Sequence, residues 1–407
     1  MKPLTHYVFF VLFIYLSACS QEPVSVASTP KSSVDVAAVV AVTVTEDWPK
    51  FLGVHQNSTS GETALLKEWP AAGPPVLWSR SIGVSFGPPV VSRGRLIVFH
   101  RVGNAEVIEC MDALDGAKVF WKHEYPTTYR DRYGYNGGPR SSATIDDERV
   151  YAYGAEGMLT CLDFETGARI WQRQVSQDFG VEQGFFGVGT APVIEGNLVL
   201  LNVGGTDGSG VVAFDTGTGE TVWKASDDSA SYSTPIVATV NGERLAIFYT
   251  GDGLLVLEPE TGKVRYRYPF RSRIRESAIA ASPVLVDDVV FLSATYQIGA
   301  VALRLTPTGL EEVWKDEKAL QTHWATSIYH EGYLYGMHGR HEGQARFRCV
   351  DFKTGEVMWT AEDDYSRVGN TITQRLGRAS FIMADGHLIA MGEGGELALI
   401  EVSPERH

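Results

Sequence analysis

The chain contains little of what marks haem-carrying, disulfide-rich or polyanion-binding proteins. Four cysteines stand among 407 residues, and the Cys-x-x-Cys-His sequence that attaches a c-type haem does not occur. Acidic residues outnumber basic ones by 49 to 35, which gives a formal net charge of −14. Nucleic acids and anionic membrane surfaces are therefore poor partners on electrostatic grounds.

The start of the chain lacks an apolar run long enough to span a bilayer. After Lys2, residues 7–16 form a run of ten apolar residues, whereas a membrane-spanning helix needs about 20. The sequence "LSAC" follows at 16–19, and the whole segment resembles a bacterial lipoprotein signal. This resemblance implies removal of residues 1–18 and lipidation of Cys19. Because Ser20 follows rather than Asp, it also implies an outer-membrane lipoprotein that faces the periplasm; an ordinary secretory signal is the alternative.

What the chain has in abundance is glycine, with 42 residues, and a repeated ten-residue pattern. The pattern is an acidic residue, two variable residues, Thr-Gly or Asp-Gly, and an aromatic residue a few positions later. Asp and Thr oxygens can accept hydrogen bonds from the amides of such a turn, and Gly takes its positive-φ position. The clearest copies are "MDALDGAKVFW" (111–121), "LDFETGARIW" (162–171), "FDTGTGETVW" (214–223) and "VDFKTGEVMW" (350–359).

Each copy belongs to a longer unit that predicts four antiparallel strands. Two apolar strands joined by a tight turn precede a third apolar strand, then the repeated turn, then a strand that carries the aromatic residue. The two-strand segments lie at 89–99, 143–154, 192–203, 235–250, 283–294, 327–338 and 381–393. The aromatic residues, 43 to 52 positions apart, are Trp78, Trp121, Trp171, Trp223, Tyr266, Trp314 and Trp359.

This count predicts an all-β, seven-bladed β-propeller of four-stranded blades, with eight blades as the alternative. Trp78 comes before any complete unit, and the last unit (381–401) has no aromatic strand after it. We therefore expect residues 76–82 to be the fourth strand of the last blade, so that the ring is closed by the two ends of the propeller. The expected organisation is a signal peptide (1–18), a flexible lipid-anchored linker (19–46), an irregular leader packed on the propeller (47–75) and the propeller (76–407).

Three cysteines remain after Cys19, namely Cys110, Cys161 and Cys349. Each precedes the hydrophobic residue before the repeated Asp, where other units carry Ala213 or Val256. Equivalent positions of different blades lie too far apart for a disulfide. We expect these cysteines to be small buried hydrophobic residues.

The pattern "LDxxTGxxxW" resembles the tryptophan-docking repeat of pyrroloquinoline-quinone-type propellers, over residues 76–402. The "DWPKFLG" sequence at 47–53 is similar to the head of many exported proteins with this repeat. The resemblance implies that each aromatic residue packs between adjacent blades. It includes two branches: the quinone-dependent alcohol dehydrogenases, and the propeller lipoprotein of the outer-membrane β-barrel assembly machinery, for which it implies eight blades.

The dehydrogenase branch uses a pair of adjacent cysteines, a Ca²⁺ ion held by Glu and Asn, and a catalytic Asp. This chain has no Cys-Cys pair and no matching acidic constellation. Pyrroloquinoline quinone is possible but unsupported, so we expect no cofactor and assign no catalytic residue. "HGRHEG" (338–343) gathers His338, His341 and Glu342, but a glycine-containing loop is a poor metal site, and we expect no metal.

Functional groups that no turn requires come just before the first strand of several blades, where they would gather at one mouth of the central channel. Such a mouth is a default ligand site, with satisfied backbone and channel filling as the alternative interpretation. The predicted ligand-binding residues are Arg140, Ser141, Tyr232, Arg275, Glu276, His323, Trp324 and Arg378. The insertions at 125–142 and 176–189 are rich in Tyr, Phe and Arg, which suits either a recognition surface or a lid.

Two functions compete on this evidence. The first is a non-catalytic, monomeric scaffold lipoprotein of the cell envelope that binds a protein partner, similar to outer-membrane assembly factors. The second is a quinone-dependent dehydrogenase-like enzyme, or a small-ligand binder such as a sugar binder, that uses Arg140, Glu276 and His323 at the channel mouth.

Overall fold

The computed structural model describes residues 46–70, 73–184, 186–274, 277–341, 345–361, 367–368, 371–372 and 376–405. The chain divides into the units Met1–Val44 and Thr45–His407, and the described residues belong to the second. The expected signal peptide, Cys19 and all but the last residue of the expected linker lie outside the described residues. Arg275 and Glu276 of the predicted mouth also lie outside them.

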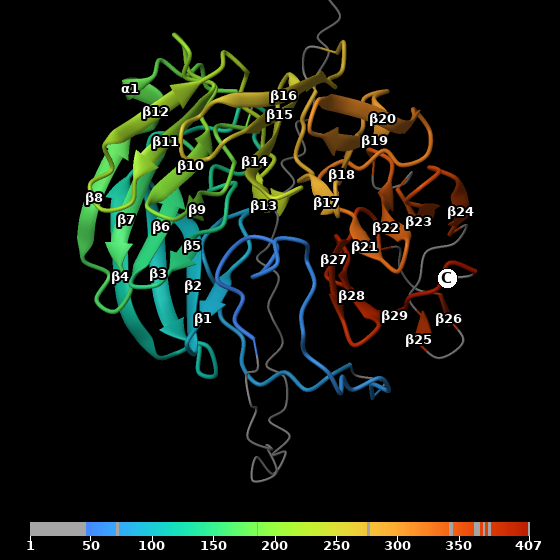
Figure 1. Ribbon diagram of the computed structural model, residues 1–407. Coiled ribbons are helices and arrows are strands. Elements are labelled where there is room, and N and C mark those ends of the chain that lie inside the picture. The colour runs from blue at the N-terminus through green and yellow to red at the C-terminus, as the bar shows by residue number, and fades with distance from the viewer. Residues whose placement is uncertain are drawn as a thin grey trace, which may run out of the picture. The chain divides into compact units, whose positions relative to one another are not determined.

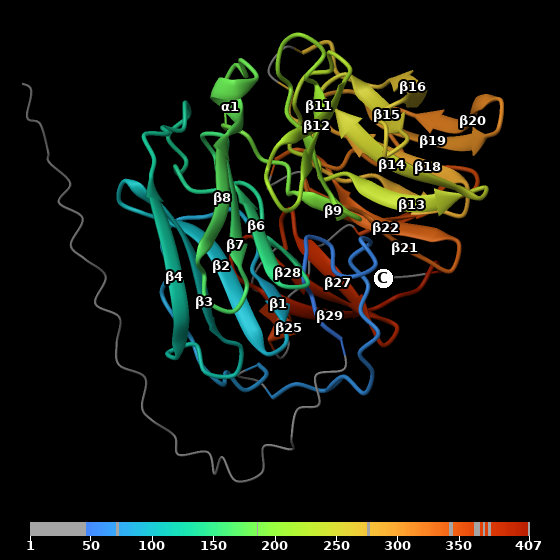
Figure 2. The same ribbon diagram turned by 60° about the vertical axis from the view of Figure 1, so that its left-hand side comes forward.

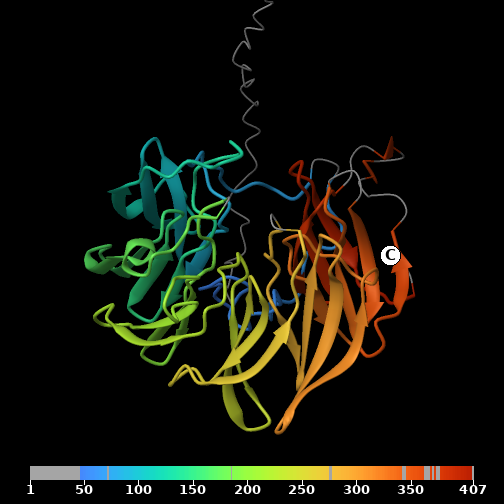
Figure 3. The ribbon, with the colours of Figure 1, turned by 90° about the horizontal axis from the view of Figure 1, so that it is seen from above.

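Seven antiparallel sheets follow one another in sequence order around a ring, and all but the last have four strands (Figures 1 and 3). The first strands of successive sheets contact one another, so they are the innermost. They are β1 (Val90–Ser92), β5 (Thr144–Asp146), β9 (Val193–Glu195), β13 (Ile236–Val240), β17 (Val284–Val286), β21 (Ile328–His330) and β27 (Ser380–Ala384). The prediction of a seven-bladed all-β propeller is confirmed.

The remaining strands continue outward as meanders. The second strands are β2 (Arg95–Val102), β6 (Arg149–Tyr153), β10 (Leu198–Asn202), β14 (Glu243–Thr250), β18 (Val289–Ala294), β22 (Tyr333–His338) and β28 (His387–Met391). The third strands are β3 (Ala105–Asp112), β7 (Met158–Asp163), β11 (Val211–Asp215), β15 (Gly253–Leu257), β19 (Gly299–Thr306), β23 (Arg346–Asp351) and β29 (Leu397–Glu401). The fourth strands are β4 (Val119–Pro126), β8 (Arg169–Gln174), β12 (Thr221–Ala225), β16 (Val264–Pro269), β20 (Gly309–Asp316) and β24 (Val357–Thr360).

Outside the blades the described residues hold little regular structure. One short helix, α1 (Val175–Asp178), follows β8, and β25 (Arg367–Val368) pairs with β26 (Thr371–Ile372) before the last blade. Within the described part of the chain, no helix has the length and apolarity needed to cross a membrane.

The repeated turn is held by its own Asp and Thr. In the second blade, Asp163 Oδ1 accepts hydrogen bonds from the amide of Thr166 at 2.8 Å and from its hydroxyl at 2.6 Å. These bonds lower the pKa of Asp163 below its ordinary value. Gly167 has a φ of +69°, and an added Cβ would lie 2.5 Å from the indole of Trp121. Glycine is therefore required twice, for the backbone angle and for the close approach of the preceding blade's aromatic ring.

All seven aromatic residues of the repeat donate a hydrogen bond to a backbone carbonyl beyond their own blade. Trp121 Nε1 reaches the oxygen of Phe164 at 2.9 Å, and Trp171 Nε1 reaches that of Thr216 at 2.9 Å. The other five pairs are Trp78–Ala113, Trp223–Pro259, Tyr266–Thr306, Trp314–Phe352 and Trp359–Ser403, at 2.7–3.1 Å. Six of these rings thus join one blade to the next, and Trp78 joins residues 76–82 to the first blade.

The hydrophobic core is divided among the blade interfaces. Six clusters of buried side chains each span two successive sheets, from the first and second to the sixth and seventh. Third strands such as β7 and β15 are buried along almost their whole length, because a neighbouring blade covers each face. Cys110, Cys161 and Cys349 are buried in these clusters or beside them as free thiols, as expected.

The closure of the ring differs from the expectation in one detail. The last sheet has three strands in the described residues, and residues 76–82 form no strand. The reason is that this segment is fastened to the first blade: Trp78 donates to Ala113, and Arg80 donates to the oxygen of Gly116 at 2.7 Å and pairs with Glu109 at 2.6 Å. Trp78 therefore takes the position of a docking residue, although its segment does not pair with β29.

The two ends of the propeller meet instead through residues 46–60, which include the first part of the expected leader and to which we restrict the word leader from here on. The amide of Ser60 donates to the oxygen of Met383 in β27 at 2.8 Å, and Thr59 and Met383 form a parallel bridge. At the other end of the leader, Trp48 forms an antiparallel bridge with Val91 of β1. Figure 2 shows this blue segment beside the innermost strands of the last blade. The leader is therefore a strand-like link between the first and the last blade.

Candidate functional site

The propeller has two faces with different chemistry. We call "hairpin face" the side that carries the turns between first and second strands and the repeated Asp turns. We call "loop face" the side where the innermost strands begin, reached by the connections 127–143, 175–192, 226–235, 270–283, 317–327 and 361–379. Of the residues predicted to bind a ligand, the six that the structure describes lie on the loop face, namely Arg140, Ser141, Tyr232, His323, Trp324 and Arg378. The leader lies on the hairpin face.

The leader covers the channel on the hairpin face. The carboxylate of Asp47 accepts hydrogen bonds from the hydroxyl of Ser92 at 2.8 Å and from the amide of Arg93 at 3.1 Å. Gln56 Oε1 accepts from the amide of Val237, so the leader reaches across to the fourth blade. Burial lowers the pKa of Lys50, which lines a cavity of about 320 Å³ between the leader and the first three blades.

On the loop face, Arg140 is occupied by the protein itself. Its Nε donates to the oxygen of Phe186 at 2.9 Å, and its Nη atoms donate to both oxygens of Asn136 and to the oxygen of Gly138. The guanidinium also forms an ion pair with Asp131, and the two side chains are 6% and 2% exposed. Arg140 therefore ties together the two insertions, 125–142 and 176–189, that the sequence singled out.

The two insertions and the loops beside them display a group of aromatic rings, which we call the aromatic platform: Phe86, Tyr133, Tyr135, Phe186 and Tyr232. Phe186 contacts the rings of Tyr133, Tyr135 and Tyr232 at centroid distances of 5.6–6.1 Å. Arg140 lies under Phe86 at 4.6 Å. Tyr135 is 71% exposed and Phe86 is 57% exposed. Exposed aromatic rings of this kind are enriched at protein interfaces.

Ser141 and Tyr232 take structural positions beside this platform. The hydroxyl of Ser141 is buried and donates to the oxygen of Tyr153 at 2.8 Å. The hydroxyl of Tyr232 accepts a hydrogen bond from the amide of Phe186 at 3.2 Å, and burial raises its pKa to about 12. Both side chains therefore help to shape the loop face around Arg140.

His323, Trp324 and Arg378 form a second group, near the fifth to seventh blades. The rings of His323 and Trp324 lie 4.5 Å apart, and Arg378 stacks over Trp324 at 4.0 Å. Arg378 also pairs with Glu393, to which its Nε donates at 2.7 Å. Burial, followed by the charges of Arg378, Arg340 and His341, lowers the pKa of His323 to about 4. His323 is therefore neutral at pH 7.

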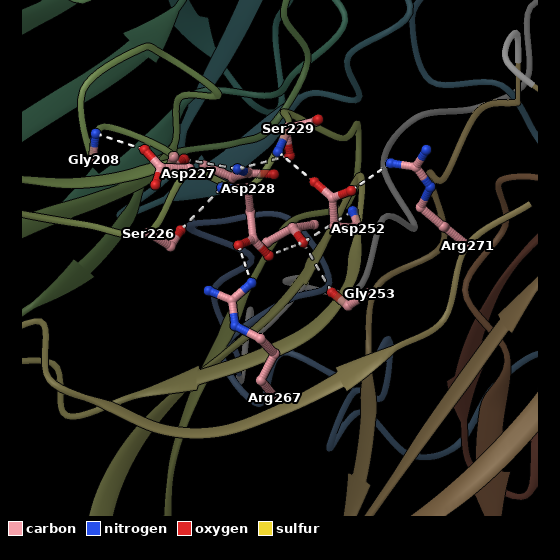
Figure 4. Close-up of polar contacts among 12 residues, drawn as sticks. Gly208, Ser226, Asp227, Asp228, Ser229, Asp252, Gly253, Arg267 and Arg271 are labelled. Carbon is pink, nitrogen blue, oxygen red and sulfur yellow. Dashed lines mark hydrogen bonds and ion pairs between the residues drawn. The ribbon is translucent and has the colours of Figure 1, made fainter.

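Carboxylates of the loop face between the third and fourth blades are all used in a polar network (Figure 4). Asp228 pairs with Arg267 and accepts a hydrogen bond from the hydroxyl of Thr250 at 2.7 Å. Asp252 pairs with Arg271 and accepts from the amide of Ser229 at 2.8 Å. Although burial opposes it, these bonds lower the pKa of Asp252. The network fastens the loop 226–232 to the fourth blade.

Sequence reasoning missed Asp131, which neutralises Arg140, and Glu106, whose side chain is buried between the first two blades. Glu106 accepts hydrogen bonds from the hydroxyl of Tyr125 at 2.7 Å and from the amide of Ala155 at 2.9 Å, and burial raises its pKa. The sequence signal for Glu106 was its position as an acidic residue within an otherwise apolar strand. Among the described residues, no group of three or more His, Cys, Asp or Glu side chains is placed to hold a metal ion.

The sequence and the structure of this chain are similar to those of known proteins. The sequence model of the family described as outer membrane protein assembly factor BamB matches residues 55–183 and, in a second match, residues 104–361. The chain belongs to this family. The match includes the repeats of the first six blades, but it assigns no binding residue.

Two relatives illustrate the likeness. Outer membrane protein assembly factor BamB of Burkholderia pseudomallei is 30% identical over 183 residues, which is 45% of this chain and 43% of that protein. The chain therefore matches less than half of the length of this curated relative. The crystal structure of BamB from Moraxella catarrhalis aligns with a TM-score of 0.50 at 18% identity, over 80% of this chain and 88% of that one. The quinohemoprotein alcohol dehydrogenase of Comamonas testosteroni aligns with a TM-score of 0.42 at 13% identity, over 85% and 76%.

Proposed function

We propose that the protein is a non-catalytic scaffold of the cell envelope that takes part in the assembly of outer-membrane proteins by binding a protein partner. The observation that carries the proposal is the family match, which extends from residue 55 to residue 361 and covers the first six blades. The relative from Burkholderia pseudomallei bears the name of an assembly factor, which supports the same role.

The aromatic platform supports the loop face as the side that binds the partner. Arg140 contacts the ring of Phe86 and binds the oxygen of Phe186, whose ring contacts Tyr133 and Tyr135. Rings packed in this way can be buried against a partner with little loss of conformational entropy. The leader binds to the first and last blades on the hairpin face, so we place the partner on the loop face. A protein partner that buries Tyr133 and Tyr135 fits this surface.

The N-terminal segment supports a location at the outer membrane. Under this proposal Cys19 carries the lipid, and the chain between Cys19 and the leader tethers a monomeric propeller on the periplasmic side. Replacement Cys19→Ser should abolish incorporation of labelled palmitate and release the protein from the outer-membrane fraction. Retention of label and of membrane association in this variant would contradict the anchor.

The scaffold role is tested in cells of the source organism that lack the gene. Loss of the protein should lower the amount of folded β-barrel protein in the outer membrane, measured by heat-modifiable mobility in gels. The wild-type gene should restore it, and the variant Tyr133→Ser/Tyr135→Ser should not. The control Leu114→Ser removes an exposed apolar side chain from the hairpin face and should restore it fully.

A binding measurement separates the scaffold from an enzyme. Crosslinking in intact cells, followed by purification in mild detergent, should recover a component of the outer-membrane assembly apparatus with wild-type protein and much less with the Tyr133/Tyr135 variant. Normal β-barrel levels in the deletion strain, or quinone-dependent turnover of an alcohol by the purified protein, would overturn the proposal.

A further inference from the structure

A cavity of about 320 Å³ opens on the loop face between the fifth and sixth blades, apart from the aromatic platform. Its walls include Ile274, Tyr296, Gln297, Arg340 and His341. The volume is at the lower end of the range found for small-molecule sites, which is about 300–1,000 Å³. No residue of the predicted channel mouth belongs to this lining, but the cavity adjoins that group. The rings of Tyr296 and His323 lie 5.8 Å apart, and Arg378 donates to the oxygen of Arg340 at 3.1 Å.

The cavity holds an arginine that lacks a carboxylate partner. The guanidinium of Arg340 stacks over the ring of Tyr296 at 4.3 Å, and within the described residues it forms no ion pair. On the same face Arg140 pairs with Asp131, Arg267 with Asp228, Arg271 with Asp252, and Arg378 with Glu393. An arginine held flat on an aromatic ring keeps the edge of its guanidinium free to bind an anion in a bidentate manner.

Basic side chains gather around Arg340, although the protein as a whole is acidic. His341 lies in the cavity wall, and the charges of Arg378, Arg340 and His341 all contribute to the low pKa of the neighbouring His323. The net charge of the chain is −14. A local positive potential on such a protein attracts an anion to this position in particular.

The backbone of the cavity wall is strained. Tyr296 and Gln297, in the turn between β18 and β19, have φ angles of +63° and +65°. Bulky residues rarely adopt this left-handed conformation, and the corresponding turn between β2 and β3 has Gly103 at its positive φ. The hydroxyl of Ser272 holds the oxygen of Tyr296 at 2.9 Å. Strained backbone conformations of this kind cluster at ligand sites. Here the conformation places the ring of Tyr296 beneath Arg340.

We propose that this cavity binds a small organic acid, whose carboxylate pairs with Arg340 and whose apolar body rests against Tyr296 and Ile274. Arg340 supplies two parallel N–H donors, and Tyr296 and Ile274 supply the apolar wall, 44% of Ile274 being exposed. Gln297 and Gln321 offer side-chain amides at the rim. The inference does not depend on the scaffold role, because it concerns another part of the loop face.

The test is a calorimetric titration of the purified full-length protein with benzoate and cyclohexanecarboxylate. Benzyl alcohol serves as the neutral analogue and inorganic phosphate as the alternative anion. We expect saturable binding of at least one acid, a higher melting temperature in its presence, and no binding of benzyl alcohol. Arg340→Gln should weaken binding at least tenfold, and Arg340→Lys should weaken it less.

The matched control is Arg169→Gln, which removes an exposed arginine from the fourth strand of the second blade and should leave binding unchanged. Circular dichroism and thermal melting of each variant report whether it is folded. The proposal is overturned if neither acid binds at millimolar concentration, if phosphate binds and the acids do not, or if folded Arg340→Gln binds as tightly as the wild type.

Discussion

Six of the seven blade interfaces are built alike, and the seventh is not. At each of the six, a buried cluster spans the two sheets and an aromatic ring of the fourth strand donates to the next turn. Between the last and the first blade, the described residues show no such cluster; Trp78 docks from a segment without a strand, and the leader pairs with β1 and β27. The regular interfaces are stabilised by hydrophobic burial, and the closing interface by backbone and side-chain hydrogen bonds.

The largest effect should come from removing a ring of a regular interface. Trp171 is 8% exposed, and Trp171→Ala should lower the free energy of unfolding by about 3–5 kcal/mol, as for other large buried aromatic residues. Trp78→Ala should cost about 1–2 kcal/mol, because this ring is only partly buried and closes no apolar cluster. Urea unfolding followed by tryptophan fluorescence measures both. Equal losses would show that the closing interface is not the weaker one.

Acid should weaken the interfaces around the sixth blade. Burial lowers the pKa of both His323 and His338 to about 4, below the ordinary value of 6.5. Their neutral forms are favoured in the folded state, so stability is complete above pH 6.5 and is lost as the pH falls towards 4. Each histidine should account for about 2–3 kcal/mol of this loss. His323→Gln/His338→Gln should flatten the dependence of stability on pH between 6.5 and 4; an unchanged slope would contradict the assignment.

A smaller effect is expected at the leader. Asp47→Ala removes the hydrogen bonds to Ser92 and Arg93 and should cost about 1–2 kcal/mol. Faster amide hydrogen exchange should appear in β1 and β27 and not in β6 or β10, because only the former pair with the leader. The exposed Glu260→Ala serves as the control. Uniformly faster exchange throughout the propeller would show that the leader stabilises all interfaces equally.

The smallest effect is a gain in stability at a regular interface. Gln297→Gly relieves one of the two left-handed residues in the turn between β18 and β19 and should stabilise the protein by about 1 kcal/mol. Thermal melting measures the gain. A loss would mean that contacts of the Gln297 side chain outweigh the strain of its backbone.

The regular interfaces could be predicted from the sequence because their determinants are local and repeated. The Asp, Thr and Gly of each turn lie within a few residues, and the docking aromatic follows at a fixed offset, so one copy explains the others. The prediction of a strand at 76–82 was wrong because it relied on the same local signal. Trp78 carries the docking signal of a fourth strand, but the strand itself depends on whether β29 or the first blade binds the segment.

The chemistry of the loop face could not be predicted, because it depends on partners from distant segments. Arg140 has the sequence context of a ligand-binding residue, but Asp131 and the carbonyl of Phe186 bind its guanidinium. Arg340 stands in a loop that we expected to bind no metal, and its stacking on Tyr296, which the sequence does not show, is the basis for proposing it as an anion-binding residue. A single sequence does not show which side chains of two distant insertions will pair.

The clasp formed by the leader also has a consequence for biosynthesis. Leu65, just past the leader, bonds to Asp385 across a separation of 320 residues, and Thr59 bridges to Met383 in the same region. The leader is synthesised early, but it can form these bonds only after the last blade has been synthesised. Until then the growing protein is an open arc whose two end blades each have one sheet face uncovered, and exposed surfaces of this kind make folding intermediates prone to aggregate. Protection of these ends until the last blade is complete is a requirement that the clasp itself creates.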